Sequence, residues 1–260
     1  MSKPKVGVSM LYCLGEPFNR MIKRLGSMQT RYIEILDDGI HELDKKRVAT
    51  LKEAAKSYDL QYSLHAPFAD INIASPSKTM LAASMKRLKQ SMVYANEMDA
   101  KVWVFHPGAK TGISQFYPNA EYKQNSQSIQ ELYKTSEEYG LNIALENLPA
   151  KYYFLMSTPE EFTHFYRETN LPVGIVLDVG HANLEGQIQP FFNLLSDKIV
   201  HIHASDNDGS DDQHLGIGKG KIDYDYFKET LNKIGYDQTV IIESITNVHE
   251  SIQKLKQLLA

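Results

Sequence analysis

The sequence predicts an α/β protein that forms a single (β/α)8 TIM barrel over residues 1–260. Three observations support this fold class. Eight short apolar runs follow one another along the chain, each gap between runs is long enough for a helix, and 260 residues is an ordinary length for one such barrel. An open, doubly wound α/β sheet gives the same local alternation, so other features must separate the two folds.

The eight apolar runs have the composition of strands that are buried on both faces of a parallel sheet. Consecutive runs start about 26 to 41 residues apart, which leaves room for a crossover helix between each pair. We therefore expect eight strands, which begin near Val6, Tyr32, Gln61, Val102, Asn142, Val173, Ile199 and Thr239.

The gaps between the runs contain helix patterns, most of them with a start signal. That signal is an Asp, Ser or Thr whose side chain can accept a hydrogen bond from the first helical turn. At Thr158 the next residues are a proline and two glutamates, which is typical of a capping box. The predicted helices run from Asp44 to Tyr58, from Ser77 to near Met98, onward from Thr158, from Asp223 to near Gly235, and over residues 248–259.

The glycines favour the closed barrel. An open sheet that binds a dinucleotide needs a GxGxxG turn directly after its first strand, whereas residues 11–16 read LYCLGE. The glycine cluster at residues 216–220 follows the seventh run instead. This cluster is either a flexible loop or a loop whose amides, together with Lys219, contact an anion such as a substrate phosphate.

Composition and charge restrict the possible partners. With 28 Lys and Arg against 32 Asp and Glu, the net charge of −4 would repel a polyanion, so a nucleic-acid partner is not expected without a strong local basic patch. Cys13 is the only cysteine, which excludes an internal disulfide and a cysteine-based zinc site. No stretch approaches the roughly 18 apolar residues of a membrane span. We expect a cytoplasmic protein without a membrane partner.

Polar residues stand where the later runs end. Active sites of (β/α)8 barrels lie at the carboxyl ends of the strands, so these positions are the first candidates for function. Two more polar residues follow the seventh run at the close spacing expected of two ligands from one loop. The candidates are His65, His106, Glu146, Asp178, His181, His203 and Glu243 at the run ends, with Asp212 and His214 in the loop.

Period-two alternation predicts that these polar side chains point into the barrel. Trp103 and Phe105 take one face of their run and His106 takes the other, so the large apolar groups face the surrounding helices. His201 and His203 share a face of the seventh run. We therefore expect His201 one layer deeper, as a buried, hydrogen-bonded histidine that supports a ligand.

Taken together, the candidates predict a divalent metal site. A single histidine or carboxylate at a strand end is most often a packed residue or a helix cap. Gathering Glu146, Asp178, Glu243 and several imidazoles around one rim is different, because each unpaired buried charge costs several kcal/mol without a compensating cation.

The strand-end motifs resemble those of the xylose-isomerase-like TIM barrels, the superfamily that includes endonuclease IV and the sugar isomerases and epimerases. The resemblance covers essentially the whole chain, and the motifs occur in order at the ends of successive runs. They are SLHAPF at His65, VFHPG at His106, ALEN at Glu146, LDVGHAN at Asp178, HIHASD at His203, DQHLGIGKG at Asp212 and IIES at Glu243.

The resemblance implies two competing ligand patterns. In the epimerases it implies one divalent metal, held by Glu146, Asp178, His203 and Glu243, with the two glutamates also moving protons. In endonuclease IV it implies three zinc ions. Their ligand sets would be His65, His106 and Glu146; then Glu146, Asp178, His203 and Glu243; and then His181, Asp212 and His214.

Charge then bears on the choice of substrate. Three Zn²⁺ with four carboxylates leave a formal charge of about +2, which suits a phosphate, whereas one ion with three carboxylates leaves about −1, which suits a neutral polyol. The loops after the second and seventh runs, residues 37–42 and 206–211, are acidic and would face DNA at the barrel mouth. This acidity argues against the nuclease.

We therefore predict a metal-dependent sugar or sugar-phosphate isomerase or epimerase that works through an enediolate, with Glu146 and Glu243 as catalytic residues. The cofactor is one to three ions of Zn, Mn, Mg or Co, and the partner is a small sugar or polyol. Phe68 would form a wall beside the sugar ring, wedge between nucleic-acid bases or simply pack, and Lys219 would contact a phosphate. A lyase acting on a cyclic polyol shares the first step. The alternative from another class is a zinc-dependent apurinic endonuclease.

Overall fold

Eight parallel strands close into a barrel in the computed structural model, which describes residues 3–260. The strands follow in chain order, and the last one pairs with the first, from Lys5 opposite Thr239 to Val8 opposite Ile242. This closing pair excludes the open sheet and confirms the (β/α)8 barrel. The strands are β1 (Lys5–Ser9), β2 (Tyr32–Leu36), β3 (Gln61–His65), β4 (Trp103–Phe105), β5 (Ile143–Glu146), β6 (Gly174–Asp178), β7 (Ile199–Ala204) and β8 (Thr239–Ile242).

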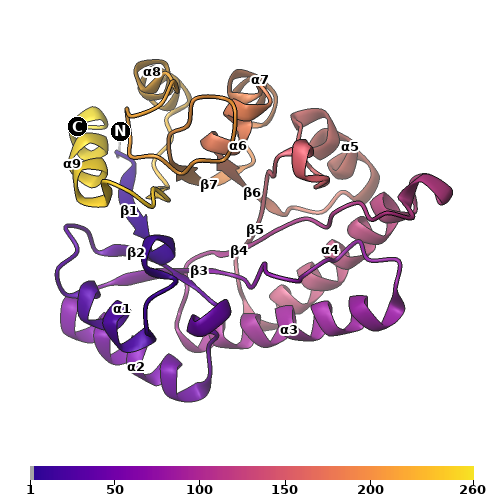
Figure 1. The fold of residues 1–260 in the computed structure, drawn as a ribbon, viewed down its shortest axis with the longest axis horizontal. Helices are drawn as coiled ribbons and strands as arrows, with labels where there is room; N and C mark the ends of the chain where they lie inside the picture. The colour runs from indigo at the N-terminus through magenta and orange to yellow at the C-terminus, as the bar shows by residue number, and fades with distance from the viewer. Residues whose placement is uncertain (1–2) are drawn as a thin grey trace.

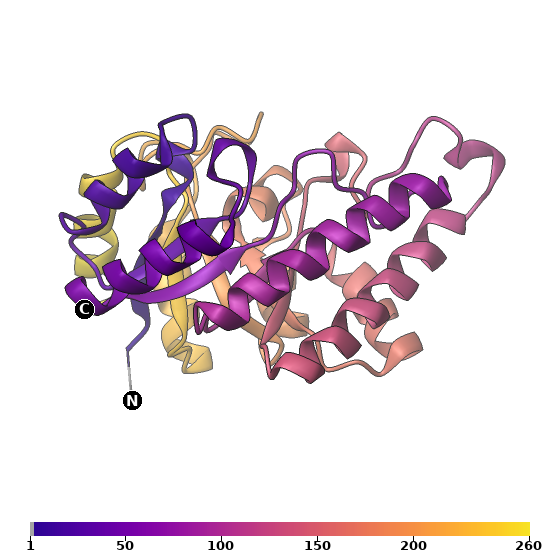
Figure 2. The ribbon, with the colours of Figure 1, turned by 90° about the horizontal axis from the view of Figure 1, so that it is seen from below.

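Helices surround the barrel on the outside (Figure 1). Seen from below, the long helices α3 and α4 lie side by side along one flank (Figure 2). The helices within residues 3–260 are α1 (Phe18–Leu25), α2 (Lys45–Tyr58), α3 (Lys78–Glu97), α4 (Ala120–Tyr139), α5 (Pro159–Thr169), α6 (Val179–Leu184), α7 (Ile188–Leu195), α8 (Tyr224–Ile234) and α9 (Val248–Leu258).

The predicted helix starts are confirmed by their caps. The side chain of Asp44 accepts a hydrogen bond from the backbone of Arg47, and Thr158 and Glu161 form the complete capping box of α5. Ser77 and Asp223 cap α3 and α8 in the same way. These caps satisfy amide groups that the first turn of a helix leaves without partners.

Apolar side chains form two layers that the barrel wall separates. The large core lies between the strands and the helices and includes Trp103 and Phe105, both fully buried. A small inner cluster of Val104, Ala144 and Val176 fills the barrel itself. The alternation predicted from the sequence is therefore confirmed: bulky residues face outward, and the inward faces carry smaller apolar residues and, at their carboxyl ends, the polar candidates.

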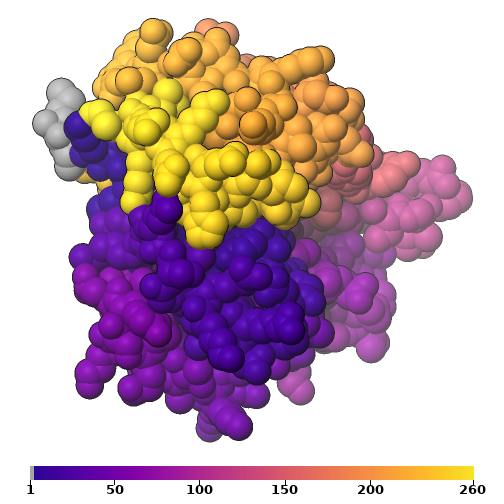
Figure 3. All heavy atoms as spheres, turned by 60° about the vertical axis from the view of Figure 1, so that its left-hand side comes forward, coloured from indigo at the N-terminus to yellow at the C-terminus, as the bar shows by residue number. Residues whose placement is uncertain are grey.

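The two ends of the described chain meet on one side of the barrel. Figure 3 shows the C-terminal helix α9 in yellow beside the indigo N-terminal segments, and α9 contacts β1 and β8. Lys3 donates a hydrogen bond to the backbone oxygen of Ala260. Within residues 3–260, no helix has both the length and the apolar character that crossing a membrane requires.

Candidate metal centre

The carboxyl end of the barrel gathers all nine predicted ligands into three adjoining groups. In each group, one donor atom from every member lies within 4.8 Å of the others. We call them the first group (His65, His106 and Glu146), the middle group (Glu146, Asp178, His203 and Glu243) and the third group (His181, Asp212 and His214). Glu146 belongs to two groups, so the first and middle groups share a carboxylate.

The backbone places these side chains through the strand ends. Parallel strands in a barrel end at one rim, so residues far apart in sequence converge there. The last residues of β3, β5 and β6 are His65, Glu146 and Asp178, while His106 and Glu243 directly follow β4 and β8. The third group draws on His181 in α6 and on two residues of the loop after β7.

In the first group, the Nε2 atoms of both histidines face one oxygen of Glu146. The distances from Oε2 of Glu146 are 3.4 Å to His65 and 3.3 Å to His106. The Nδ1 atom of His65 lies 2.8 Å from the backbone oxygen of Ala66. A carbonyl oxygen only accepts, so Nδ1 of His65 carries the proton and its Nε2 is free to bind a cation.

In the middle group, His203 turns its Nδ1 atom toward two carboxylates. This atom lies 3.4 Å from Oε1 of Glu146 and 3.5 Å from Oε2 of Glu243. Asp178 uses its Oδ1 to accept a 2.6 Å hydrogen bond from the backbone of His181, at the start of α6. Its other carboxylate oxygen remains available to the group.

The third group is centred on Asp212. Oδ2 of Asp212 lies 3.3 Å from Nε2 of His181 and 3.1 Å from Nε2 of His214. The Nδ1 atoms of these rings lie 2.9 Å and 3.0 Å from the backbone oxygens of Asn147 and Glu243. Both rings therefore carry their proton on Nδ1 and present Nε2 to Asp212, which is the tautomer that a metal ligand needs.

The donor set fits divalent cations in two respects. Buried atoms with no hydrogen-bond partner within residues 3–260 include one carboxylate oxygen each of Glu146, Asp178 and Asp212 and both ring nitrogens of His203. Leaving such an atom unsatisfied costs about 1–3 kcal/mol. Two ligands about 2.1 Å from one tetrahedral ion lie about 3.4 Å apart. The observed separations between imidazole nitrogen and carboxylate oxygen, 3.4 Å for His203 and Glu146, have this spacing.

The pKa values of the three carboxyl groups in the middle group are shifted in different directions. For Asp178 and Glu243 the loss of hydration prevails, so the pKa of each stands above its ordinary value. Burial also acts on Glu146, but the imidazoles of His203 and His106 outweigh it and hold the pKa of Glu146 well below the ordinary value. Without a cation, Glu146 is the most readily ionised of the three.

His65 in the first group and His214 in the third group hold protons when no cation is present, whereas burial lowers the pKa of His106. Burial alone would lower the pKa of His65 and His214, but Glu146 beside His65 and Asp212 beside His214 raise each pKa to about 9. An incoming metal ion must therefore displace a proton from each ring.

Phe68 lies against the first group. Its ring centroid is 5.5 Å from that of His65 and 5.6 Å from that of His106. The backbone amides of Phe68 and Ala69 donate hydrogen bonds of 2.7 and 2.8 Å to Oδ2 of Asp38, which fixes the loop that carries the ring. Phe68 thus forms a wall beside the candidate metal centre, whereas its contact with a sugar remains a prediction.

Lys219 is exposed in the glycine-rich loop after β7. This loop is folded around the buried carboxylate of Asp206, which accepts hydrogen bonds of 2.8 Å from the amide of Gly218 and 3.1 Å from that of Ile222. These two amides are therefore occupied by a carboxylate of the protein. Contact between Lys219 and a substrate phosphate remains a prediction that rests on the side chain alone.

The two acidic loops expose less negative charge than their sequences suggest. Asp37 is fully buried, and its Oδ1 lies 2.6 Å from Nη2 of Arg87. Asp206 is also fully buried, and Asp211 forms an ion pair of 3.1 Å with Lys151. Several acids of the two loops therefore hold the loops together, so the loops offer less negative charge at the barrel mouth than expected from the sequence.

One buried carboxylate near the site is absent from the sequence-based prediction. Glu34 in β2 is fully buried and contacts His201 and His203 inside the barrel. The expectation that His201 is a buried, hydrogen-bonded histidine below the ligands is confirmed by its 3.0 Å bond to Glu34. The signal for Glu34 was its place between two isoleucines, on the inward face of a buried strand.

A closed parallel barrel with imidazoles and carboxylates gathered at the carboxyl end of its strands defines a (β/α)8 protein whose candidate site lies where barrel enzymes carry theirs. The chain matches the family described as "Xylose isomerase-like TIM barrel" over residues 22–259, and it belongs to that family. The resemblance seen in the strand-end motifs is thereby confirmed.

Relatives in this family carry names from both predicted classes. The chain is 32% identical over 259 residues to an uncharacterized protein of Methanocaldococcus jannaschii, covering 98% of this chain and 88% of that protein. It is 26% identical over 208 residues to a probable endonuclease 4 of Aquifex aeolicus, covering 73% of this chain and 72% of that one. A solved D-tagatose 3-epimerase-like protein is similar with a TM-score of 0.92 and 32% identity, over 98% of this chain and 97% of that one.

Proposed function

We propose that this protein is a divalent-metal-dependent isomerase or epimerase of sugars or sugar phosphates, which moves a proton at the carbon next to a carbonyl group. One observation carries the proposal: two buried glutamates from different strand ends, Glu146 and Glu243, lie within 3.5 Å of the same nitrogen of His203. Their pKa values are displaced in opposite directions. Such a split is the usual arrangement of an acid and base pair.

The middle group supplies the residues for a cation. Glu146, Asp178, His203 and Glu243 would hold it, and when bound it would polarise the substrate carbonyl and stabilise negative charge on oxygen. The donor oxygens and nitrogen suit Mn²⁺, Zn²⁺, Co²⁺ or Mg²⁺. Three carboxylates around one divalent cation leave a formal charge of about −1, which suits a neutral hydroxylated substrate.

The two glutamates carry the proton transfer. Glu146, the more readily ionised of the two in the metal-free protein, takes the proton from the carbon next to the carbonyl, which leaves an enediolate. Glu243 returns a proton to the carbon. Return to the opposite face of that carbon gives an epimer. Return to the neighbouring carbon, together with transfer of the hydroxyl proton from one enediolate oxygen to the other, gives an isomer. Phe68 covers one side of the sugar ring.

The similarity to the D-tagatose 3-epimerase-like structure supports this proposal, because it spans 98% of this chain at 32% identity. The test is incubation of the metal-loaded protein with ketoses, aldoses and their phosphates in D2O. We expect an epimer or isomer with deuterium at the carbon next to the carbonyl, seen by NMR, and none with the Glu146→Gln variant. Intact, unlabelled sugars throughout the panel would contradict the proposal.

A second candidate function is a zinc-dependent phosphodiesterase of the endonuclease IV type. The third group favours it, because His181, Asp212 and His214 have ligand spacing that one-metal sugar chemistry does not require. We expect a duplex with an abasic site to bind no better than the non-specific level of roughly 10⁻⁴ to 10⁻⁶ M at physiological salt. Efficient incision, lost in Glu146→Gln and in His214→Ala, would establish the nuclease instead.

A further inference from the structure

The geometry points to Glu34 as a positioning residue that fixes the ring of His203, so that Nδ1 of this histidine faces the middle group. The inference rests on the proposed function only in taking His203 as a metal ligand. Glu34 lies in β2, outside all three groups of predicted ligands. It is fully buried, as is His203.

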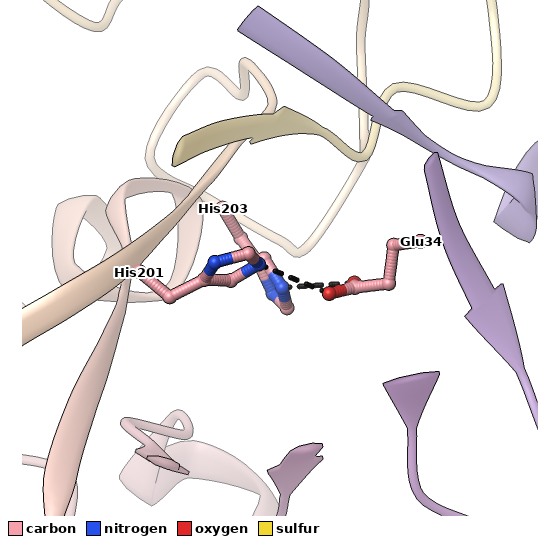
Figure 4. A group of neighbouring side chains, drawn as sticks. All are labelled: Glu34, His201 and His203. Atoms are coloured by element: carbon pink, nitrogen blue, oxygen red, sulfur yellow. Dashed lines mark hydrogen bonds and ion pairs between the residues drawn. The ribbon is translucent and has the colours of Figure 1, made fainter. Parts of the chain in front are cut away.

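Figure 4 shows the three side chains of Glu34, His201 and His203 pointing toward one another across the barrel interior. Glu34 comes from β2, and the two histidines come from β7, which is not a neighbour of β2 in the barrel. The carboxylate of Glu34 therefore reaches His203 through the barrel interior, from a strand separated from β7 by β1 and β8. Backbone pairing alone does not bring these residues together.

The two oxygens of Glu34 have separate partners. Oε2 accepts a 3.0 Å hydrogen bond from Nε2 of His201 and a 2.9 Å hydrogen bond from the hydroxyl of Ser63. Oε1 lies 3.0 Å from Nε2 of His203 as an ion-pair contact. His201 and Ser63 thus occupy one oxygen and hold the carboxylate in place, which leaves the other oxygen for His203.

This arrangement determines which nitrogen of His203 carries the proton. A ligand nitrogen must be unprotonated, and Nδ1 is the atom that faces Glu146 and Glu243. The proton of the neutral ring is then on Nε2, where the carboxylate of Glu34 can only accept. A carboxylate behind a ligating histidine fixes its tautomer and orientation and makes the ring a stronger ligand.

A different role for the same three residues is a cation site of their own, since one donor atom from each lies within 4.8 Å of the others. That role would need Nε2 of His203 as a ligand, although Nε2 is the atom left to carry the proton when Nδ1 binds. We therefore favour positioning, and the experiment separates the two roles by counting ions.

The test compares Glu34→Gln with Asp37→Asn in the full-length protein. Asp37 is a matched control, because it is a fully buried acid just after the same strand but pairs with Arg87 and not with a predicted ligand. Affinity for Zn²⁺ is measured by competition with a chromophoric chelator, and the d–d spectrum is recorded with Co²⁺. We expect Glu34→Gln to weaken the tightest ion by about 10- to 100-fold and to change the Co²⁺ spectrum.

The control Asp37→Asn should lose thermal stability and keep its metal affinity and Co²⁺ spectrum. Unchanged affinity in Glu34→Gln, or an equal loss in both variants, would overturn the inference, and so would the loss of one whole ion equivalent in Glu34→Gln alone. If Glu34→Gln does not fold, ¹⁵N NMR of the imidazoles in metal-loaded wild-type protein decides. Nδ1 coordination with a proton on Nε2 of His203 supports the inference, and Nε2 coordination refutes it.

None of these measurements uses a sugar. Absence of turnover in the D2O experiment would therefore remove the proposed activity and leave the metal-affinity comparison intact. Normal turnover of the wild-type protein, together with unchanged metal affinity in Glu34→Gln, would support the proposed activity and overturn the role of Glu34.

Discussion

Asp178 accepts a 2.6 Å hydrogen bond at Oδ1 from the backbone N–H of His181. One carboxylate therefore caps α6, which carries a ligand of the third group, while its Oδ2 has no hydrogen-bond partner within residues 3–260 and is left for the middle group. Asp178 thus joins the middle and third groups, which also meet where Nδ1 of His214 lies 3.0 Å from the backbone oxygen of Glu243. Loss of an ion from one group is therefore expected to affect the other.

The two glutamates are the first residues to replace. Glu146→Gln and Glu243→Gln keep the side-chain volume and remove the ability to take or return a proton. We expect each to lower kcat by about 10²- to 10⁴-fold. Steady-state kinetics on the sugar identified in D2O provides the measurement, and Glu42→Gln, an exposed acid in the β2 loop, is the control. Near-normal kcat in either variant with full metal content would remove that residue from the mechanism.

The third group gives a prediction about ion number. If it binds its own ion, His181→Ala and His214→Ala should each lose one metal equivalent, because only three side chains hold that ion. The ion of the middle group should remain. Elemental analysis of protein purified without chelators supplies the count, and His164→Ala, whose half-buried histidine lies in α5 outside the three groups, is the control. Equal ion content in all variants would show that these histidines serve another role, such as contact with the substrate.

Metal uptake should release protons near neutral pH. In the metal-free protein the neighbouring carboxylates raise the pKa of His65 and His214 from 6.5 to about 9, so both rings are charged at pH 7.5. Filling the first and third groups should release about one proton from each ring. Calorimetric titration in buffers of different ionisation enthalpy measures this number, and a binding heat independent of the buffer would contradict it.

The raised pKa values of His65 and His214 predict that rising pH destabilises the metal-free protein and stabilises the metal-loaded protein. A histidine whose pKa is raised on folding stabilises the folded state fully below its unfolded pKa of about 6.5. This contribution is lost as pH rises through about 9 for His65 and His214. The metal-free protein should therefore lose stability between these pH values, while the metal-loaded protein gains from tighter binding. Thermal unfolding with and without chelator across this range tests the sign.

Lys219 is predicted to affect the KM of phosphorylated sugars and not that of free sugars. Lys219→Ala should raise KM for a sugar phosphate by about 2- to 5-fold, since an exposed ion pair contributes little, and should leave the free sugar unaffected. Lys221→Ala, on an exposed neighbour in the same loop, is the control. The same KM ratio in wild type and Lys219→Ala would leave Lys219 with no role beyond its loop.

The ion pair below the β2 loop should matter for stability and not for chemistry. Arg87→Met leaves the fully buried carboxylate of Asp37 without its partner, and we expect a loss of about 3–5 kcal/mol in the free energy of unfolding. Arg31→Met removes the exposed pair with Asp59 and should cost about 1 kcal/mol or less. Denaturant unfolding curves measure both, and equal losses would contradict the distinction.

The barrel was predictable because its strands and many of its helices carry local signals. Apolar runs marked all eight strands, and Asp44, Ser77, Thr158 and Asp223 marked helices through their own side chains. The remaining helices were harder to locate. The N-terminal caps of α1, α4 and α7 make no side-chain hydrogen bond, and α6 is capped by Asp178, which the sequence shows as a strand-end acid.

The site was predictable where it depends on strand ends and was missed where it depends on contacts across the barrel. Glu34 has the alternation of an inward-facing residue, but its partner His201 lies 167 positions away on a strand that does not pair with β2. The inward direction of Asp37 likewise depends on Arg87, fifty positions away. The sequence does not distinguish a loop acid that is buried against an arginine from one that points to solvent.

The three groups draw their ligands from β3 through β8 and the segments that follow these strands. Neither β1 (Lys5–Ser9) nor β2 supplies a ligand, but β2 contacts the candidate ligand His203 through Glu34, whereas β1 has no residue in any group. Bound ions would therefore link the carboxyl ends of six consecutive strands, β3 to β8. In contrast, β1 is held in the barrel by its backbone hydrogen bonds to β2 and β8 and by side-chain packing. Filling the site should slow amide hydrogen exchange unevenly around the ring. The amides of β1 should gain the least protection, so that the loaded barrel opens along this seam before it unfolds.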